Sequence, residues 1–393
     1  LNTDAGPDFF NAKIEMDGHM WVGNVEMHYR ATDWKRHRHD SDKAYDSVIL
    51  HEVAKDDAPV RRTNGKLIPQ LVLEVSPQFN ADYASLVGAT IEVPCAEKIK
   101  QVPHLTIVEW VEGLAFERLH GKVERIHQLL DSFNGSWEDV CYVTLARNFG
   151  FGINNDAFER LARRTPLRLL GKHSDSVLQI EALLFGQAGM LDAQKPGMDS
   201  YYNQLCTEYA FLSNKFQLTP MEKESWKLFR IRPQNFPYRR IAMLAQFIEG
   251  GFRMMNRILE AEGEKEMRAL FEVELSGYWT KHYTFGKPNE RATATLSRSS
   301  IDIILINTVA PLLYAYGELT GNYEMTDKAI KLLEDLRAES NSIVSHFVAY
   351  GIDCPDALTS QALVQLKREY CDARKCIYCK IGHHLLSKAA RGE

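Results

Sequence analysis

Residues 9–29 read FFNAKIEMDGHMWVGNVEMHY, and this stretch decides the fold class of the first part of the chain. Two short runs rich in β-forming residues, 9–16 and 21–29, flank the dipeptide Asp17-Gly18. Aspartate followed by glycine has a high propensity for a hairpin turn. The stretch therefore predicts an antiparallel β-hairpin near the start of the chain.

The register of this hairpin decides which side chains share a face of the sheet. A two-residue turn at residues 17–18 would place Asp8 opposite Met27 and turn Glu26 to the other face. A three-residue loop at 16–18, with its glycine in the left-handed conformation, would shift the pairing by one residue and set Asp8 opposite Glu26. In this second register the acids share their face with an apolar floor formed by Phe10, Ala12, Ile14, Met20 and Val22. Trp21, Val25 and Met27 make the other face apolar as well, so the sequence leaves both registers open.

Beyond the hairpin, the sequence predicts further β-structure and then a change to helical periodicity near residue 105. A strand is expected at 47–54, a second hairpin at 60–75 around Asn64-Gly65, one more strand at 88–93, and a short helix or ordered loop at 32–46. Helices are expected at 108–133, 137–149, 156–164, 177–189, 201–216, 239–262, 264–276, 301–320, 325–347 and 358–370. The predicted fold class is α+β, with a small mixed β-sheet domain at 1–103 followed by a large all-α domain at 104–393.

Net charge, cysteine number and the absence of long apolar runs indicate which classes of protein the composition favours. The formal net charge of −5 excludes a general electrostatic attraction to nucleic acid, so any such role needs local basic patches. The odd number of cysteines, seven, suits a reducing compartment. We find no apolar run of roughly 18 residues and no signal peptide, which predicts a cytoplasmic protein without a membrane partner. The chain begins at Leu1 without a methionine, and we expect native residues before it.

The hairpin carries the first candidate site. An acid on one strand, Asp8, with Glu26 and His28 on the other, is a pattern that can hold a divalent metal ion if the two carboxylates face the same side. Mg²⁺ and Mn²⁺ prefer carboxylate oxygens as ligands. The expected cofactor at Asp8 and Glu26 is therefore Mg²⁺ or Mn²⁺.

These residues carry two resemblances. Pro7-Asp8 and Glu26-Met27-His28 resemble the motifs of the PD-(D/E)XK nuclease superfamily, with histidine where that family has lysine. Over most of its length the chain is similar to an uncharacterised bacterial family with a domain of unknown function. That similarity rests on AGPDF, GNVEMH, DW with His37 and His39, VILHEV, RPQNFPYRRIA and the terminal cysteine motif YC-KC-YC-IG.

The nuclease resemblance implies a restriction-endonuclease-like sheet in the first domain. It also implies that Asp8, Glu26 and His28 are catalytic and that a bound metal activates water against a phosphodiester. Histidine is mostly neutral at pH 7, whereas lysine is a fixed cation, so the role of His28 differs from that of the family's lysine.

A histidine-rich segment follows the hairpin. His37 and His39 lie two residues apart beside Asp40 and Asp42, and His51 is on the next predicted strand. Such residues can ligate zinc or manganese. The alternatives are a polar loop whose histidines bond to the backbone, or a pair that holds a substrate phosphate beside the hairpin.

The last segment carries a second candidate metal site. Cys371, Cys376 and Cys379 have spacings typical of thiolate ligands to Zn²⁺, and the fourth ligand would be Cys354 or His383. An iron–sulfur cluster is a second candidate. The alternative to a metal site is a set of reduced cysteines that pack against a terminal helix.

Residues 227–240 contain five Lys or Arg residues, three aromatic residues and no acid. Arg232, Arg239 and Arg240 are therefore candidate contacts to a nucleic-acid backbone, unless they pair with acids elsewhere in the chain.

Three hypotheses follow from these sites. The first is a metal-dependent nuclease or nuclease-like nucleic-acid-processing protein. The second is a catalytically inactive nucleic-acid-binding or interaction scaffold. The third is a hydrolase of a small phosphoester centred on His37 and His39.

Overall fold

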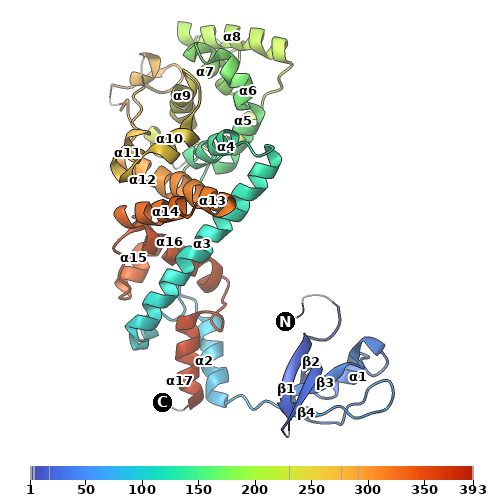
Figure 1. Ribbon diagram of the computed structural model, residues 1–393. Coiled ribbons are helices and arrows are strands. Elements are labelled where there is room, and N and C mark those ends of the chain that lie inside the picture. Colours follow the sequence, from blue (N-terminus) through green and yellow to red (C-terminus); the bar gives the residue numbers. More distant parts are fainter. Residues whose placement is uncertain are drawn as a thin grey trace. The chain divides into compact units, whose positions relative to one another are not determined.

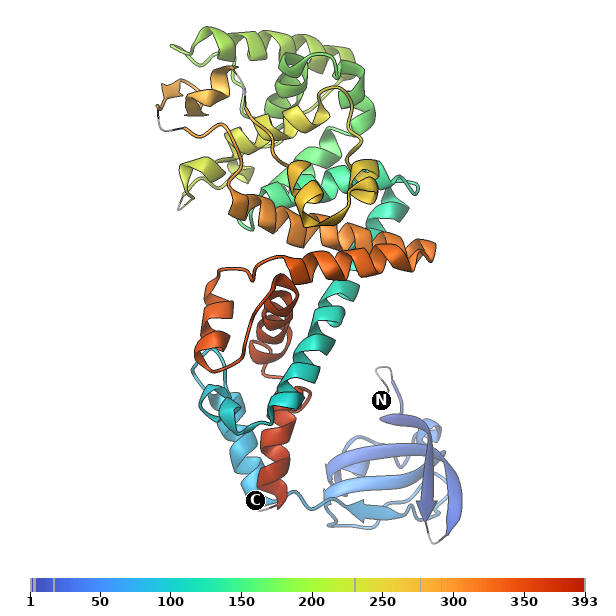
Figure 2. The ribbon, with the colours of Figure 1, turned by 60° about the vertical axis from the view of Figure 1, so that its left-hand side comes forward.

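The computed structural model describes residues 2, 5–16, 18–229, 231–275, 277–290 and 292–391. The chain forms two compact units. The N-terminal unit comprises residues 1–95 with 374–393, and the helical unit comprises residues 96–373. Figures 1 and 2 show the sheet of the first unit in blue and the helices of the second from cyan to red. The predicted α+β class, a small mixed sheet followed by a mostly helical region, is confirmed.

The N-terminal unit is built on a four-stranded sheet of order β1-β2-β3-β4. The strands are β1 (Phe9–Met16), β2 (His19–Arg30), β3 (Val48–Lys55) and β4 (Gln70–Val72). β1 runs antiparallel to β2, whereas β3 runs parallel to both β2 and β4. The hairpin expected at 60–75 is reduced to one antiparallel bridge between Arg61 and Leu67, and β4 instead joins the main sheet.

The hairpin register combines features of both predicted alternatives. Met16 pairs with His19, so the three-residue loop is wrong, although Gly18 does adopt a left-handed φ of +73°. The predicted turn residue Asp17 lies outside the described residues. A β-bulge between Phe9 and Ala12 then shifts the pairing by one residue.

Asn11 forms this bulge, with a left-handed φ of +51°. Its backbone N–H donates to Asn24 Oδ1 at 3.1 Å, because the bulge removes it from the ladder. Beyond the bulge Phe9 pairs with Val25, which brings Asp8 beside Glu26. The apolar floor is corrected in consequence: Ala12 and Ile14 pair with Gly23 and Trp21 on the face opposite the acids, and Phe10, Met20 and Val22 remain on the face of Glu26.

The core of the N-terminal unit lies under a short helix. Trp34 of α1 (Asp33–Arg36) is fully buried and donates its indole N–H to the carbonyl of Arg61 at 3.1 Å. It packs in one apolar cluster with Ala31, Tyr45, Val48, Val53, Val60 and Ile68. Residues 32–46, predicted as a short helix or ordered loop, contain α1 and the 3₁₀ turn η1 (Lys43–Tyr45).

Two further helices belong to the N-terminal unit: one that the sequence did not predict, and the terminal helix that was considered for the cysteine segment. α2 (Pro77–Gly88) and α17 (Lys380–Arg391) pack together, and Leu86 and Leu386 meet in a buried cluster. α2 begins at Ser76, whose hydroxyl accepts from the N–H of Phe79. The strand predicted at 88–93 is wrong, because Gly88 ends α2 and the residues after it form no strand.

The helical unit has one continuous apolar core. The 29-residue helix α3 (His104–Ser132) packs against α13 and α16, as both views show (Figures 1 and 2). The other helices are α4 (Trp137–Phe149), α5 (Asn155–Arg164), α6 (Leu167–Leu170), α7 (Val177–Gln187), α8 (Ser200–Phe216), α9 (Pro237–Ile248), α10 (Met254–Glu260), α11 (Gly263–Ala269), α12 (Arg298–Ile304), α13 (Ala310–Thr320), α14 (Tyr323–Asp335), α15 (Ser342–Ala349) and α16 (Ala357–Gln365). Two π-helical segments, η7 (Leu305–Val309) and η8 (Leu366–Cys371), and a small hairpin of β5 (His282–Thr284) and β6 (Lys287–Pro288) complete the unit.

Two predicted helices are each divided in the structure. The helix expected at 239–262 breaks after Ile248, because Gly250 and Gly251 both adopt positive φ angles. The helix expected at 325–347 ends at Asp335, and α15 restarts with Asn341 as its N-cap, whose side chain accepts from the N–H of Val344.

One helical segment is apolar enough to be considered for a membrane. By length and composition Arg298–Thr320 could span a bilayer, but 78% of its most apolar window is buried inside the protein. Burial of this extent is what the core helix of a folded domain shows.

The burial of Trp34 generates a prediction for stability. We expect Trp34→Ala to lower the free energy of unfolding of the N-terminal unit by about 3–5 kcal/mol, because it removes a fully buried indole. Trp21→Ala is the matched control, since that side chain is 49% exposed, and should cost less than about 1 kcal/mol. Urea denaturation followed by circular dichroism measures both, and equal losses would contradict the assigned core.

Candidate metal centre in the N-terminal unit

The parallel pairing of β2 with β3 positions the first residues of the site. Glu26 on β2 is the register partner of His51 on β3, and His28 follows two residues after Glu26. Because side chains alternate along a strand, these three side chains lie on one face of the sheet. Glu26 is 5% exposed and His51 is fully buried.

The bulge in β1 adds Asp8 to this face. The backbone N–H of Asp8 donates to Glu26 Oε2 at 3.0 Å, and Asp8 Oδ2 accepts from the N–H of Met27 at 2.9 Å. The two predicted acids therefore lie side by side. Asp8 orients the Glu26 carboxyl through its backbone and places a second negative charge beside it.

Helix α1 and the turn after it supply two more histidines. Asp33 anchors α1 by accepting from the N–H of Arg30 at 3.1 Å. The helix ends with His37, whose N–H donates to the carbonyl of Asp33. Arg38 then adopts a left-handed φ of +64°, which turns the chain so that the N–H of His39 bonds to the carbonyl of Trp34 at 3.0 Å.

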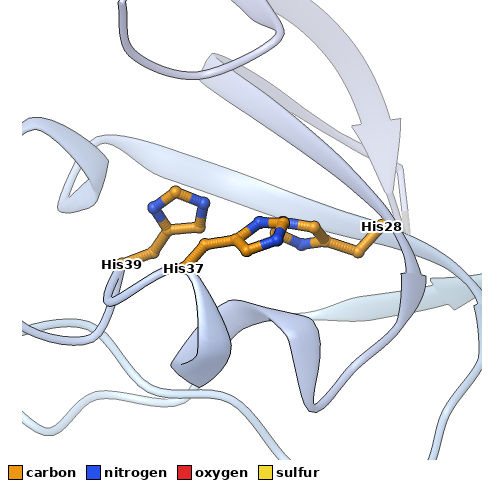
Figure 3. Close-up of side chains that lie close together, drawn as sticks. All are labelled: His28, His37 and His39. Atoms are coloured by element: carbon orange, nitrogen blue, oxygen red, sulfur yellow. The ribbon is translucent and has the colours of Figure 1, made fainter.

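These elements bring the imidazole rings together. His28 Nε2 lies 3.0 Å from His37 Nδ1, and His28 Nδ1 lies 2.8 Å from His51 Nε2. One ring nitrogen from each of His28, His37 and His39 falls within 4.8 Å of the other two. Figure 3 shows the rings of His28, from the strand, and His37, from the end of α1, directed toward one another with His39 beside them.

The Glu26 carboxyl borders this group of imidazoles. Its Oε1 atom lies 3.4 Å from His39 Nε2 and 3.6 Å from His28 Nε2. Burial raises the pKa of Glu26 to about 7, a rise that the hydrogen bond from the Asp8 backbone opposes and the Asp8 charge reinforces. The carboxyl thus titrates close to neutral pH.

The buried environment favours the neutral form of His28, His39 and His51. Burial, together with the neighbouring imidazoles, lowers the pKa of His28 to about 4, and burial lowers the pKa of His51 to about 4. Burial also lowers the pKa of His39. A neutral imidazole is the form that binds a metal ion.

The donor set fits a transition metal. Three imidazole nitrogens with an adjacent carboxylate suit Zn²⁺ or Mn²⁺, whereas Mg²⁺ prefers an all-oxygen shell. His51 would orient a ligand rather than bind the metal itself. Its Nε2 contacts the Nδ1 of His28, while the Nε2 of His28 is directed at His37. The Nδ1 atom of His51 is buried without a hydrogen-bond partner.

The structure places the predicted arginines in a different setting. Arg239 is fully buried and donates to the carbonyls of Trp279 and His282. Arg240 is 2% exposed and donates to Asn235 Oδ1 at 2.6 Å. These two arginines lie in the interior of the helical unit, and Arg232 alone of the three is exposed.

The predicted cysteine site is distributed between the two units. Cys376 and Cys379 are buried in the turn that precedes α17, and Cys95 packs against the same cluster. Burial, then the neighbouring Cys379 and Cys376, raises the pKa of the Cys95 thiol to about 12. Cys371 ends η8 in the helical unit, where Cys354 Sγ also lies, 3.8 Å from the carbonyl of Asp356. The exposed His383 ring contacts the Ser387 hydroxyl at 3.2 Å. The zinc site stays a prediction.

Sequence reasoning left the direction of His51 open and did not connect Trp34 and Tyr45 with the histidine site. His51 faces the cluster because β3 pairs in parallel with β2, and Trp34 supports the rings of His28, His39 and His51 from the core side. The ring of Tyr45 stacks on that of His39, with centroids 3.7 Å apart. The sequence offered one signal for His51: like Glu26 and His28, it is a polar residue within a predicted strand.

Comparison with known proteins places the chain in one family. A family model described as "Protein of unknown function (DUF2851)" matches residues 1–342. This match confirms the predicted similarity to a family with a domain of unknown function, whereas the nuclease resemblance stays a prediction. No curated protein and no solved structure matches the chain.

The shifted pKa values predict how stability depends on pH without metal. His28 and His51 bind fewer protons in the folded state than in the unfolded state between pH 6.5 and about 4, so acidification through this window destabilises the N-terminal unit. Glu26 acts in the opposite direction, because its raised pKa makes the folded state bind the extra proton between about pH 7 and 4.5.

Two imidazoles outweigh one carboxyl, so we expect the free energy of unfolding to fall as pH is lowered from 6.5 to 4.5. Glu26→Gln removes the opposing contribution and should steepen the fall, by up to about 1.4 kcal/mol per pH unit. Urea titrations at several pH values in EDTA measure both slopes. A slope that Glu26→Gln leaves unchanged would contradict the raised pKa.

Proposed function

The chain belongs to the DUF2851 family, and we propose that its N-terminal unit is a divalent-metal-dependent hydrolase that cleaves phosphodiester bonds in nucleic acid. One observation carries the proposal: three imidazole nitrogens converge within 4.8 Å beside a buried carboxyl whose pKa is about 7. Groups with perturbed pKa values that converge in this way are characteristic of catalytic sites.

In this proposal His28, His37 and His39 hold the metal ion, with Zn²⁺ or Mn²⁺ as the expected occupant. When bound, the ion would polarise a phosphoryl oxygen and lower the pKa of a bound water. Glu26 would act as the general base, because a carboxyl with a pKa of about 7 can accept a proton at neutral pH and release it afterwards. Asp8 would orient Glu26 through the hydrogen bond from its backbone N–H to the Glu26 carboxyl.

The surroundings of the site favour an extended, charged substrate. His37 is exposed, so the metal position opens to solvent. Lys35, Arg36 and Arg38 flank it on the same turn, with exposed side chains that suit a phosphate backbone. Phe10, 52% exposed, lies on the face of Glu26 and offers a ring on which a base can stack.

Metal binding can be tested apart from catalysis. We expect the full chain to bind one Mn²⁺ or Zn²⁺ ion that the double variant His28→Ala/His37→Ala does not bind, because two of three ligands are lost. Isothermal titration and elemental analysis measure the stoichiometry. Cys376→Ser/Cys379→Ser separates this ion from any zinc at the cysteines, since it should leave the histidine-dependent ion in place.

The control for this measurement is His127→Ala, which removes an exposed histidine of α3 outside the site and should leave metal binding unchanged. Equal metal content in the double variant and in the unaltered chain would overturn the assignment of the ligands.

Cleavage is the test of the function itself. We expect labelled DNA or RNA oligonucleotides to be cut in the presence of Mn²⁺ or Zn²⁺, and Glu26→Gln to slow the reaction about 10²–10⁴-fold, because glutamine cannot accept the proton. Metal affinity should be retained in Glu26→Gln, which distinguishes a lost base from a lost ligand.

Salt-dependent binding of nucleic acid without cleavage by the metal-loaded chain would reject the hydrolase and favour the inactive scaffold. Cleavage that survives both Glu26→Gln and the double histidine variant would show that this site does not perform it.

A further inference from the structure

The helical unit contains a polar pocket that the proposed hydrolase does not use. Its volume is about 500 Å³, a size that accommodates a small organic ligand. The walls come from α3, α4, α12, α16, both π-helical segments, the first residues of α5 and α15 with the loops before them, and the 3₁₀ turn at 233–235. The lining side chains are unusually rich in amides: Asn148, Asn155, Asn235, Asn307, Asn341 and Gln361.

Three cations gather at this pocket with little negative charge to balance them. Arg118 and Arg368 line it, and Lys122 lies behind two lining amides, donating from Nζ to Gln361 Oε1 at 2.8 Å and to Asn307 Oδ1 at 3.2 Å. Arg118 Nε donates to the same Gln361 oxygen at 2.7 Å. Two cations therefore share one neutral amide oxygen.

Among the described residues that line the pocket, Glu339 is the one with a carboxylate, and it accepts a hydrogen bond from the Gln361 amide. Arg368 is exposed, and the described residues place no carboxylate in an ion pair with it. Arg118 donates hydrogen bonds to Gln361 and Gln365, which uses two of the five N–H donors of its guanidinium group. Donors are thus left over on both arginines.

The pKa values of the pocket cations also reflect an excess of positive charge. Burial, then the charge of Arg118, lowers the pKa of Lys122 to about 7; the charge of Glu339 opposes this shift, and that of Arg368 adds to it. Burial and the charge of Arg368 lower the pKa of Arg118. Charges that depress one another in this way would be relieved by an anion placed among them.

The backbone around the pocket departs from regular helix at several points. Asn307 lies in η7 and Arg368 in η8, and π-helical segments are frequent at functional sites. The rim residue Phe151 has a left-handed φ of +45° and is followed by Gly152 at +87°. A bulky side chain in this conformation stores strain of the kind that clusters at ligand sites.

We propose that this pocket binds a small phosphate monoester, with the phosphate between Arg118 and Arg368 and the hydroxyl or base groups on the surrounding amide side chains. Arginine matches phosphate oxygens by paired, charge-assisted hydrogen bonds. Asn307 and Gln361 use both of their polar side-chain atoms within the protein, and Asn155, Asn235 and Asn341 use their Oδ1 atoms. The Nδ2 groups of Asn155, Asn235 and Asn341 are the donors that would meet the oxygen and nitrogen acceptors of a sugar or a nucleobase. A nucleoside monophosphate and a sugar phosphate share this chemistry.

Isothermal titration of the full chain tests the proposal, with AMP against adenosine and glucose 6-phosphate against glucose. EDTA in the buffer removes metal from the histidine site, so that phosphate bound there does not contribute. We expect at least one phosphate ester to bind and its unphosphorylated counterpart to bind at least tenfold more weakly. Arg368→Ala should weaken that binding about tenfold or more, because it removes a charge-assisted contact from an exposed side chain that folding does not require.

Arg368→Lys keeps the charge without the paired geometry and should fall between the unaltered chain and Arg368→Ala. Arg168→Ala removes another exposed arginine of the helical unit, away from the pocket, and should leave binding unchanged. Binding of AMP alone would identify a nucleotide as the ligand, and binding of glucose 6-phosphate alone a sugar phosphate. The proposal is overturned if neither ester binds, or if Arg368→Ala binds them as the unaltered chain does.

Discussion

The burial of the Glu26 carboxyl against a group of imidazole rings is the constraint on which the N-terminal site depends. A buried carboxylate is costly unless hydrogen bonds or positive charge compensate it, and here the Asp8 backbone supplies a hydrogen bond while neutral histidines supply little charge. Its pKa therefore rises toward neutrality. The same burial lowers the pKa of His28 and of His51, so one cause shifts both the carboxyl and the imidazoles on which the proposed hydrolase would depend.

That constraint is maintained by backbone features outside the strands' regular ladder. The bulge at Asn11 moves Asp8 from beside Met27 to beside Glu26, and the left-handed turn at Arg38 brings His39 back over Trp34. Trp34 then serves the core and the site together, because the indole that fills the centre of the N-terminal unit also contacts three of the imidazole rings.

Each unit buries ionisable groups among neutral polar partners, a carboxyl in the N-terminal unit and cations in the helical unit. In the N-terminal unit a carboxyl is buried among neutral nitrogen donors, whereas in the helical unit Lys122 and Arg118 are held by the neutral oxygen of Gln361. Each arrangement leaves charge that a ligand of opposite sign would compensate, a cation in the first case and a phosphate in the second. Buried groups with perturbed pKa values cluster at functional sites, and this is the reasoning behind both proposals.

The sequence by itself determined the α+β class, the strands at 9–16 and 47–54, and most of the helices, because hydrophobic period, glycine turns and N-caps act over a few neighbouring residues. It also pointed to Asp8, Glu26, His28, His37 and His39. Where several residues must agree across elements, local pattern was insufficient. The predicted three-residue hairpin loop was wrong, although the bulge still brings Asp8 beside Glu26. Arg239 and Arg240, predicted as surface contacts to nucleic acid, are interior residues. Only the tertiary structure decided that four histidines converge and that Cys95 lies with Cys376 and Cys379, because the direction of each side chain depends on strand pairing, bulges and packing between segments far apart in the chain.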